Sequence, residues 1–106
     1  MRGGARFTVP SLVLQARKRE GETTDRILAR FGFTATKSLG GAVVRNRARR
    51  RLKEAVRLTG PAHAVEGYDY VLIAREGTVQ RQFAELIKDL ERALIKVHEP
   101  SSAKKR

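Results

Sequence analysis

Residues 43–57, VVRNRARRRLKEAVR, hold seven basic residues and a single acidic one, Glu54. At about 100° per residue, the apolar side chains of this stretch fall within a sector of about 120°, as in a helix with one buried face. This apolar stripe comprises Val44, Ala48, Leu52, Ala55 and Val56. The basic side chains cover the remaining surface, where like charges at helical spacing repel one another. The stretch therefore predicts a helix that anchors the fold on one side and presents positive charge to an anionic partner on the other.

The segments on either side of this helix predict an α+β fold. Residues 11–17 and 30–36 alternate between apolar and polar side chains, which is typical of half-buried strands. The polar segment 18–26 between them predicts a hairpin connection. Residues 68–75 contain the continuous apolar run Val71, Leu72 and Ile73, which is typical of a strand covered on both faces. The predicted order is strand, strand, basic helix, strand and a closing helix.

Local signals set the predicted ends of the helices. Gly60 permits a left-handed C-terminal residue and Pro61 cannot continue a helix, so the pair predicts the end of the basic helix. Thr78 is the predicted N-cap of an amphipathic helix over residues 79–97. No internal repeat or long linker divides the sequence. We therefore expect one domain over residues 1–99 and a disordered basic tail at residues 100–106.

The composition restricts the class of protein and of partner. The 106 residues are 41% hydrophobic and 32% charged, which excludes both a disordered polyelectrolyte and a membrane-spanning protein. Residues 1–10 lack the apolar core of a signal peptide, so we expect a cytoplasmic protein. The absence of cysteine excludes disulfides and thiolate metal sites. The net charge of +12 at pH 7 indicates an anionic partner, either nucleic acid or a membrane surface.

The sequence offers no convincing set of catalytic residues. His63 has Glu66 three residues later, but a single His-x-x-Glu without a second histidine is a common chance spacing. We expect His63 and His98 to be exposed surface residues rather than catalytic groups or metal ligands. Asp69 and Glu54 are predicted to pair with basic side chains. The sequence therefore predicts neither a protein active site nor a metal site in this chain.

The basic helix carries the strongest functional signal. Six of its seven basic residues are arginine, whose planar guanidinium makes bidentate contacts with phosphate and stacks on bases. Asn46, between Arg45 and Arg47, adds a donor and an acceptor that can read a sugar or base edge. The first helical turn presents amide groups that attract phosphate, and Lys37 stands shortly before it. These features favour nucleic acid as the partner, although a solvated charged face is the simpler explanation of a basic run.

The aromatic residues add little to this signal. Phe31, Phe33 and Phe83 occupy positions that the apolar patterns assign to the core, which disfavours stacking on exposed bases. Phe7 lies in a polar, irregular stretch. It is therefore the aromatic candidate for nucleic-acid contact.

Residues 32–57, GFTATKSLGGAVVRNRARRRLKEAVR, resemble the signature of the bacterial ribonuclease P protein subunit. That family carries a strand ending in Ser/Thr-Lys-Lys, a glycine turn, Ala-Val and then an Arg-Asn-Arg helix. The corresponding residues here are Thr36-Lys37-Ser38, Gly40-Gly41, Ala42-Val43-Val44 and Arg45-Asn46-Arg47, continuing through Arg49-Arg50. The resemblance extends over residues 7–97, because the other predicted strands and the closing helix stand where the family has corresponding elements.

The resemblance implies an α/β sandwich, with a small mixed sheet and helices, that is similar to a ribosomal protein domain. Its basic helix makes an unusual left-handed crossover between parallel strands, against the general right-handed rule. The family begins with a further helix, which has an Arg-rich start and a Phe-containing motif and forms one wall of a leader cleft. The present sequence begins after that helix. We expect either that its start was assigned at an internal Met or that this wall is absent.

The resemblance also implies a function. Proteins of this family are subunits of the ribonuclease P holoenzyme, an endoribonuclease that removes the 5′ leader from precursor tRNA. The implied partners are the catalytic ribonuclease P RNA and precursor tRNA, with no role for DNA or membranes. The RNA makes the cleavage site and uses the Mg²⁺ ions. No residue of this chain is then expected to be catalytic or to bind a metal or another cofactor.

The family's binding residues carry over to the positions that match its motif. The implied contacts with the RNA subunit are Lys37, Arg45, Asn46, Arg47, Arg49, Arg50, Arg51 and Lys53. The implied leader cleft, between the basic helix and the open sheet face, comprises Val13, Gln15, Arg45, Asn46, Arg49 and Lys53. Ser38 stands where a second lysine is common, and Gly41 where asparagine is usual. Gln15 replaces an aromatic residue of some relatives, which favours hydrogen bonding over stacking there.

Two other functions are compatible with a basic helix. The first is a non-enzymatic RNA-binding module, such as a ribosomal protein or an RNA chaperone, which would bind RNA without restoring precursor cleavage by a ribonuclease P RNA. The second is a DNA-binding regulator that reads the major groove. The second lacks support, because the sequence shows no second helix of a helix-turn-helix unit.

Overall fold

The computed structural model describes residues 4–19 and 29–99. In chain order the elements are β1 (Gly4–Val9), β2 (Leu12–Lys18), β3 (Arg30–Thr34), the 3₁₀ helix η1 (Lys37–Leu39), α1 (Ala42–His63), β4 (Tyr68–Ala74), α2 (Glu76–Gln80) and α3 (Phe83–Lys96). The strands form one sheet in the order β1-β2-β4-β3. β3 and β4 are parallel and the other neighbours are antiparallel, so the sheet is mixed. The α+β class predicted from the sequence is confirmed.

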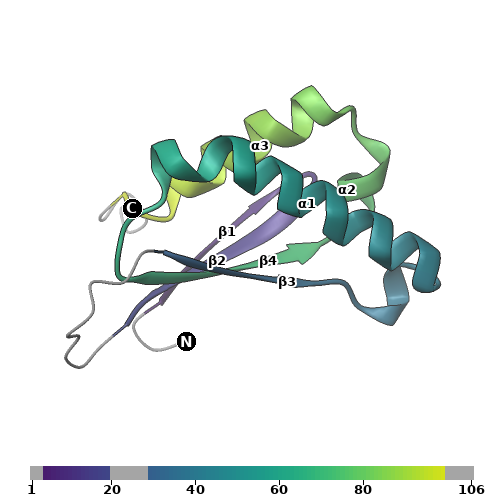
Figure 1. Ribbon diagram of the computed structural model, residues 1–106, viewed down its shortest axis with the longest axis horizontal. Coiled ribbons are helices and arrows are strands. Elements are labelled where there is room, and N and C mark those ends of the chain that lie inside the picture. The colour runs from purple at the N-terminus through teal and green to yellow at the C-terminus, as the bar shows by residue number, and fades with distance from the viewer. Residues whose placement is uncertain (1–3, 20–28, 100–106) are drawn as a thin grey trace, which may run out of the picture.

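Both long helices lie on the same face of the sheet (Figure 1). α1 packs over β3 and β4, and α3 packs over β1 and β2. Alternate strand residues point into this layer, and Leu12, Leu14 and Leu72 are fully buried there. Within the described residues, no helix covers the opposite face of the sheet. In this part of the chain the fold therefore consists of one helical layer on one sheet, and no helix is long and apolar enough to cross a membrane.

The connection from β3 to β4 sets the position of α1. The two strands are parallel neighbours, and the chain between them passes through η1 and α1. In Figure 1, β3 lies in front of β4, both strands run toward the right, and α1 returns above them. This crossover is left-handed, as the family resemblance implies, whereas most βαβ units are right-handed. It places the N-terminal end of α1 beside the C-terminal end of β3.

Three predictions about strands are wrong. The stretch around Phe7 is not irregular but forms β1, where Phe7 packs against the buried core. β2 and β3 do not form a hairpin, because β4 lies between them and pairs with both. β4 is not covered on both faces: Leu72 is buried, but Val71 and Ile73 are only half-buried because the helices pack on one face. Most of the predicted connection at residues 18–26 and the predicted tail at residues 100–106 lie outside the described residues.

The helix ends also differ from the prediction. α1 continues through Pro61 to His63, because a proline in the last turn removes only one backbone hydrogen bond and the Ala64 N–H still closes a turn on the Gly60 carbonyl (2.7 Å). The closing helix is two helices, α2 and α3, with a break at residues 81–82. Thr78 is therefore inside α2 rather than at an N-cap. Its hydroxyl accepts a hydrogen bond from the Arg75 N–H (3.0 Å) and donates one to the Ser11 carbonyl.

Candidate nucleic-acid interface

The apolar stripe of α1 packs against the core as predicted. Ala48, Leu52 and Ala55 are 0% exposed, and Val44 and Val56 are half-buried beside them. Because these residues fix the rotation of α1 about its axis, they also fix the direction in which each basic residue points. The other side chains of α1 divide into one flank that faces β3, one flank that faces α2 and α3, and an outward surface.

The flank that faces β3 carries three cations at helical spacing, Arg45, Arg49 and Lys53. The Lys53 ammonium lies 5.9 Å from the ring centroid of Phe33 on β3. Arg49 donates a hydrogen bond to the Asn46 side-chain oxygen (2.8 Å). This hydrogen bond orients both side chains at the surface, where each keeps further donors for a ligand.

The opposite flank contains Arg51, whose guanidinium is directed into the protein. Its Nε donates to the Thr78 carbonyl (2.8 Å), and a terminal nitrogen donates to the Arg81 carbonyl. The guanidinium carbon also lies 5.6 Å from the ring centroid of Phe83. Burial lowers the pKa of Arg51, and the positive charge of Arg47 lowers it further. Arg51, predicted as an RNA contact, thus joins α1 to the α2–α3 connection.

Two arginines beside it behave differently. Arg47 and Arg50 are exposed, and neither has a hydrogen-bond or ion-pair partner among residues 4–19 and 29–99. Glu54 does not neutralise them, because Arg57 donates to both of its carboxylate oxygens (3.0 and 2.6 Å). These bonds lower the pKa of Glu54 and confirm that it is a pairing residue. Arg47 and Arg50 therefore present uncompensated charge to the solvent.

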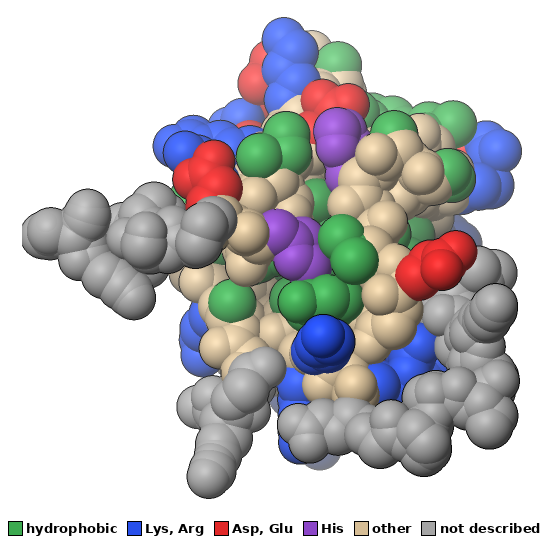
Figure 2. Space-filling view, turned by 90° about the vertical axis from the view of Figure 1, so that its left-hand side faces the viewer, with side chains coloured by type: hydrophobic (Ala, Val, Ile, Leu, Met, Phe, Trp, Pro, Cys, Tyr) green, Lys and Arg blue, Asp and Glu red, His purple; other side chains and the backbone are tan. Residues whose placement is uncertain are grey.

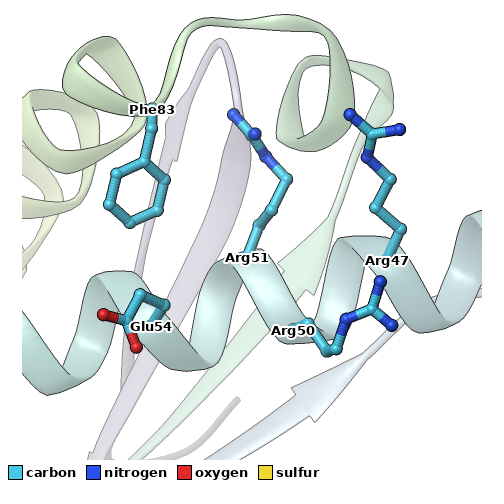
Figure 3. A pocket seen from close by; sticks show the side chains of 5 residues that line it. All are labelled: Arg47, Arg50, Arg51, Glu54 and Phe83. Atoms are coloured by element: carbon cyan, nitrogen blue, oxygen red, sulfur yellow. The ribbon is translucent and has the colours of Figure 1, made fainter.

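A shallow groove of about 340 Å³ lies between α1 and the start of α3. Its lining residues are Arg47, Arg50, Arg51, Glu54 and Phe83 (Figure 3). Four of them come from one side of α1, and Phe83 is the first residue of α3. Phe83 packs against the core, as predicted, but it is only half-buried and also lines the groove. Sequence reasoning missed the groove because the helical pattern did not reveal the break before α3.

The predicted leader cleft does not form as a single surface. Val13 and Gln15 alternate with Leu12 and Leu14, so they lie on the face of the sheet opposite α1. The helical members of the set, Arg45, Asn46, Arg49 and Lys53, lie on the helical side of the sheet. The sheet separates the two groups. Val13 is also buried, and Gln15 is half-buried.

The N-terminal end of α1 has the predicted electrostatic character. Gly41 is its N-cap and supplies no capping side chain, and the first turn contains no acidic residue. Lys37 lies in η1 and is exposed beside this end. The amide groups of the first turn and the lysine thus add positive potential to that of the helix arginines.

The histidines and Asp69 lie elsewhere. His98 is not an exposed residue: its Nε2 lies 2.6 Å from the Tyr70 hydroxyl, which accepts a hydrogen bond from the Val65 N–H (2.9 Å). His63 is half-buried, 3.9 Å from Glu91. Figure 2 shows histidine side chains at the surface of one end of the molecule, with backbone, uncharged polar and some hydrophobic groups between them.

Asp69 pairs with basic side chains, as predicted. It accepts hydrogen bonds from Arg19 and from Arg30 (3.0 Å), which lower its pKa, with Arg30 making the larger contribution. It is thus a partner in an ion-pair cluster on the sheet. Across the described ranges, no three His, Asp or Glu side chains are grouped so that they could hold a metal ion.

Known proteins are similar to this chain in sequence and in fold. The family model described as Ribonuclease P matches residues 1–98. The ribonuclease P protein component of Caulobacter vibrioides is 53% identical over 85 residues, which cover 80% of this chain and 55% of that protein. That of Gluconacetobacter diazotrophicus is 52% identical over 93 residues, covering 88% and 77%. The chain therefore spans little more than half the length of the Caulobacter relative.

The solved structure of the ribonuclease P protein from Thermotoga maritima superposes with a TM-score of 0.73. It is 22% identical, and the match covers 91% of this chain and 86% of that one. At this identity the similarity shows the shared fold. From the family match and its closely similar bacterial relatives, we conclude that the chain belongs to the ribonuclease P protein family.

Proposed function

We propose that this protein is the protein subunit of ribonuclease P. It binds the catalytic RNA subunit and the 5′ leader of precursor tRNA, and so assists the endonucleolytic cut that produces the mature tRNA 5′ end. The single observation that carries the proposal is the uncompensated positive surface of α1 in a chain of this family. This surface consists of Arg47, Arg50 and the three cations of the flank that faces β3. The apolar stripe of α1 is buried against the core.

The chemistry of these residues favours phosphate as the missing partner. Guanidinium groups at helical spacing repel one another unless anions lie between them, and each can hold a phosphate through two parallel hydrogen bonds. The five candidates for phosphate contact are Arg45, Arg47, Arg49, Arg50 and Lys53. If all five meet phosphates, the logarithm of RNA affinity should fall with the logarithm of salt concentration with a slope of about −3.5 to −4.5. A slope near about −1 would indicate one contact.

Bond cleavage belongs to the RNA in this proposal. The Mg²⁺ ions of the reaction are assigned to the RNA subunit, as the family resemblance implies. The chain's own contribution is to bind RNA and to orient the leader. Because Val13 and Gln15 lie on the other face of the sheet, we assign the α1 end of the leader path to Arg45, Asn46, Arg49 and Lys53.

Reconstitution tests the proposal directly. A bacterial ribonuclease P RNA and a precursor tRNA are mixed at low Mg²⁺, with and without the protein, and the cleavage rate is measured. We expect the protein to restore cleavage. RNA binding without restored cleavage would instead favour a non-enzymatic RNA-binding module, and cleavage by the protein without RNA would contradict the proposal.

A pair of double variants assigns the effect to α1. Arg49→Ala with Arg50→Ala should leave the melting temperature nearly unchanged, since Arg50 is exposed and half-buried Arg49 makes only a surface hydrogen bond to Asn46. Surface substitutions of this kind change stability by about 0.5 kcal/mol or less. It should weaken RNA binding and make the salt slope shallower by about 1.4 to 1.8. Lys88→Ala with Lys96→Ala removes the same charge from exposed positions of α3 and is the matched control. Equal losses in both variants would mean that net charge alone drives binding.

A further inference from the structure

The groove between α1 and α3 has two chemically different ends. Arg47 and Arg50 lie toward the N-terminal end of α1, whereas Glu54 and Phe83 lie at the other end (Figure 3). Arg47 and Glu54 are seven residues apart, which is about 10 Å along a helix axis. A phosphate is attracted to the unpaired guanidinium groups at the arginine end, whereas at the other end the charge of Glu54 is already paired with Arg57. The Phe83 end instead offers an aromatic ring and a hydrogen-bond acceptor.

The side of the groove formed by Arg51 and Phe83 is held in place by contacts outside the groove. The two hydrogen bonds of Arg51 to the α2–α3 connection fix its guanidinium beside the Phe83 ring. α2 packs closely against the β1–β2 turn. The contact at Gly77 is so tight that an added Cβ atom would lie 2.5 Å from the Pro10 carbonyl oxygen. This side of the groove is thus formed before any ligand binds. A rigid site loses little conformational entropy on binding.

We propose that this groove binds one unpaired nucleotide of an RNA, with its base against Phe83 and its phosphate between Arg47 and Arg50. The proposal rests on the proposed function and deepens it, because it adds a subsite on the flank of α1 that faces away from β3. The match is one of shape and charge: an unstacked base needs an aromatic surface, and its backbone needs cations beside it. A duplex segment does not expose a free base for such a site.

Replacing the aromatic ring tests the base end. Phe83→Leu keeps an apolar side chain but removes the stacking surface, so affinity for a bacterial ribonuclease P RNA should fall by about 5- to 150-fold. The salt slope should stay the same, because no phosphate contact is lost. Phe7→Leu is the matched control: Phe7 is also half-buried with an arginine, Arg92, 5.9 Å from its ring, but it lies on β1. Phe7→Leu should retain wild-type affinity.

Replacing the cations tests the phosphate end. Arg47→Gln with Arg50→Gln should weaken binding and also make the salt slope shallower by about 1.4 to 1.8. Both side chains are exposed, so this variant reports on the groove even if Phe83→Leu proves too unstable to measure. An unchanged salt slope in Phe83→Leu and a shallower one in the double arginine variant would distinguish a base end from a phosphate end.

Crosslinking locates the bound nucleotide. The sequence has no cysteine, so Glu54→Cys provides a unique attachment point for a photoreactive group in the groove. We expect crosslinks to one unpaired nucleotide of the RNA that disappear when Phe83→Leu is added. Val65→Cys, an exposed position after α1, is the control and should not label that nucleotide.

The outcomes separate the two proposals. If the wild-type protein does not bind the RNA, both fail. If it binds and restores cleavage while Phe83→Leu and Phe7→Leu bind equally well, the proposed function stands and the nucleotide subsite is refuted. Crosslinks spread over paired segments would refute the subsite in the same way.

Discussion

Arg50 and Arg51 are neighbours in the sequence but belong to different regions of the molecule. Arg51 donates two hydrogen bonds to carbonyl groups of the α2–α3 connection and is half-buried. Arg50 has no partner in the described part of the chain and is exposed at the edge of the groove. One step along a helix turns a side chain by about 100°, which here moves it from the inner flank to the outward surface. The same residue type thus stabilises the fold in one position and is exposed to the solvent in the next.

Leu52→Ala should give the largest effect on stability, because it changes the fully buried face of α1. Leu52 is 0% exposed at the centre of the apolar stripe, so the variant should lose about 2 to 5 kcal/mol of unfolding free energy. The change is measured by urea unfolding. RNA affinity, measured under conditions where the variant is folded, should be unchanged. A stable Leu52→Ala protein with impaired RNA binding would mean that the buried and outward faces of α1 are reversed.

Comparing Arg51→Met with Arg50→Met tests whether the first arginine stabilises the fold and the second does not. Loss of the Arg51 hydrogen bonds leaves the Thr78 and Arg81 carbonyls without these donors, and should cost about 1.5 to 3 kcal/mol of stability. Arg50→Met should change stability by about 0.5 kcal/mol or less and act on RNA affinity instead. Arg51→Lys should not restore stability, because an ammonium lacks the planar fork that reaches both carbonyls. Equal stability of the two methionine variants would show that the hydrogen bonds of Arg51 do not contribute to the stability of the fold.

Gly77→Ala tests the contact between α2 and the β1–β2 turn, which positions the α2–α3 connection that Arg51 binds. The added Cβ would lie 2.5 Å from the Pro10 carbonyl oxygen, so α2 must shift, at a cost of about 1 to 3 kcal/mol. Gly32→Ala on β3 is the control, because its Cβ would approach the nearest atom, the Tyr70 carbonyl oxygen, only to 4.0 Å. Thermal unfolding of both variants measures the difference. We expect the melting temperature of Gly77→Ala to be the lower one, and the reverse order would exclude a tight contact between α2 and the β1–β2 turn.

A pH titration should give the smallest effect. Burial lowers the pKa of His98 from its ordinary value of 6.5, so the folded protein favours the neutral imidazole. The corresponding stability is present above pH 6.5 and decreases as the pH falls through and below this value. Between pH 7 and pH 5 the arginines of α1 stay charged, so RNA contacts and this change in stability are separable. Unfolding of His98→Gln should depend less on pH in this window, and an unchanged pH dependence would rule out His98 as its source.

The local sequence pattern of α1 predicted its buried stripe correctly. A stripe of Ala48, Leu52 and Ala55 repeats with the period of the helix itself, so no knowledge of the rest of the fold is needed to find it. The glycine turn and the Arg-Asn-Arg segment identified the family in the same way, because a signature is a property of consecutive residues. The resemblance also supplied the left-handed crossover, which periodicity cannot give.

Tertiary structure alone decided what each flank of α1 faces. The carbonyl groups that hold Arg51 come from residues 27 and 30 positions later in the chain, and no local pattern announces such a pairing. The same holds for Val13 and Gln15, whose separation from α1 depends on which face of the sheet the helices cover. The sequence by itself determined where α1 is apolar and where it is charged, since side-chain direction follows the helical period. Only packing between distant segments determined which charges stayed exposed at the surface, because a hydrogen bond inside the protein removes a donor from the surface.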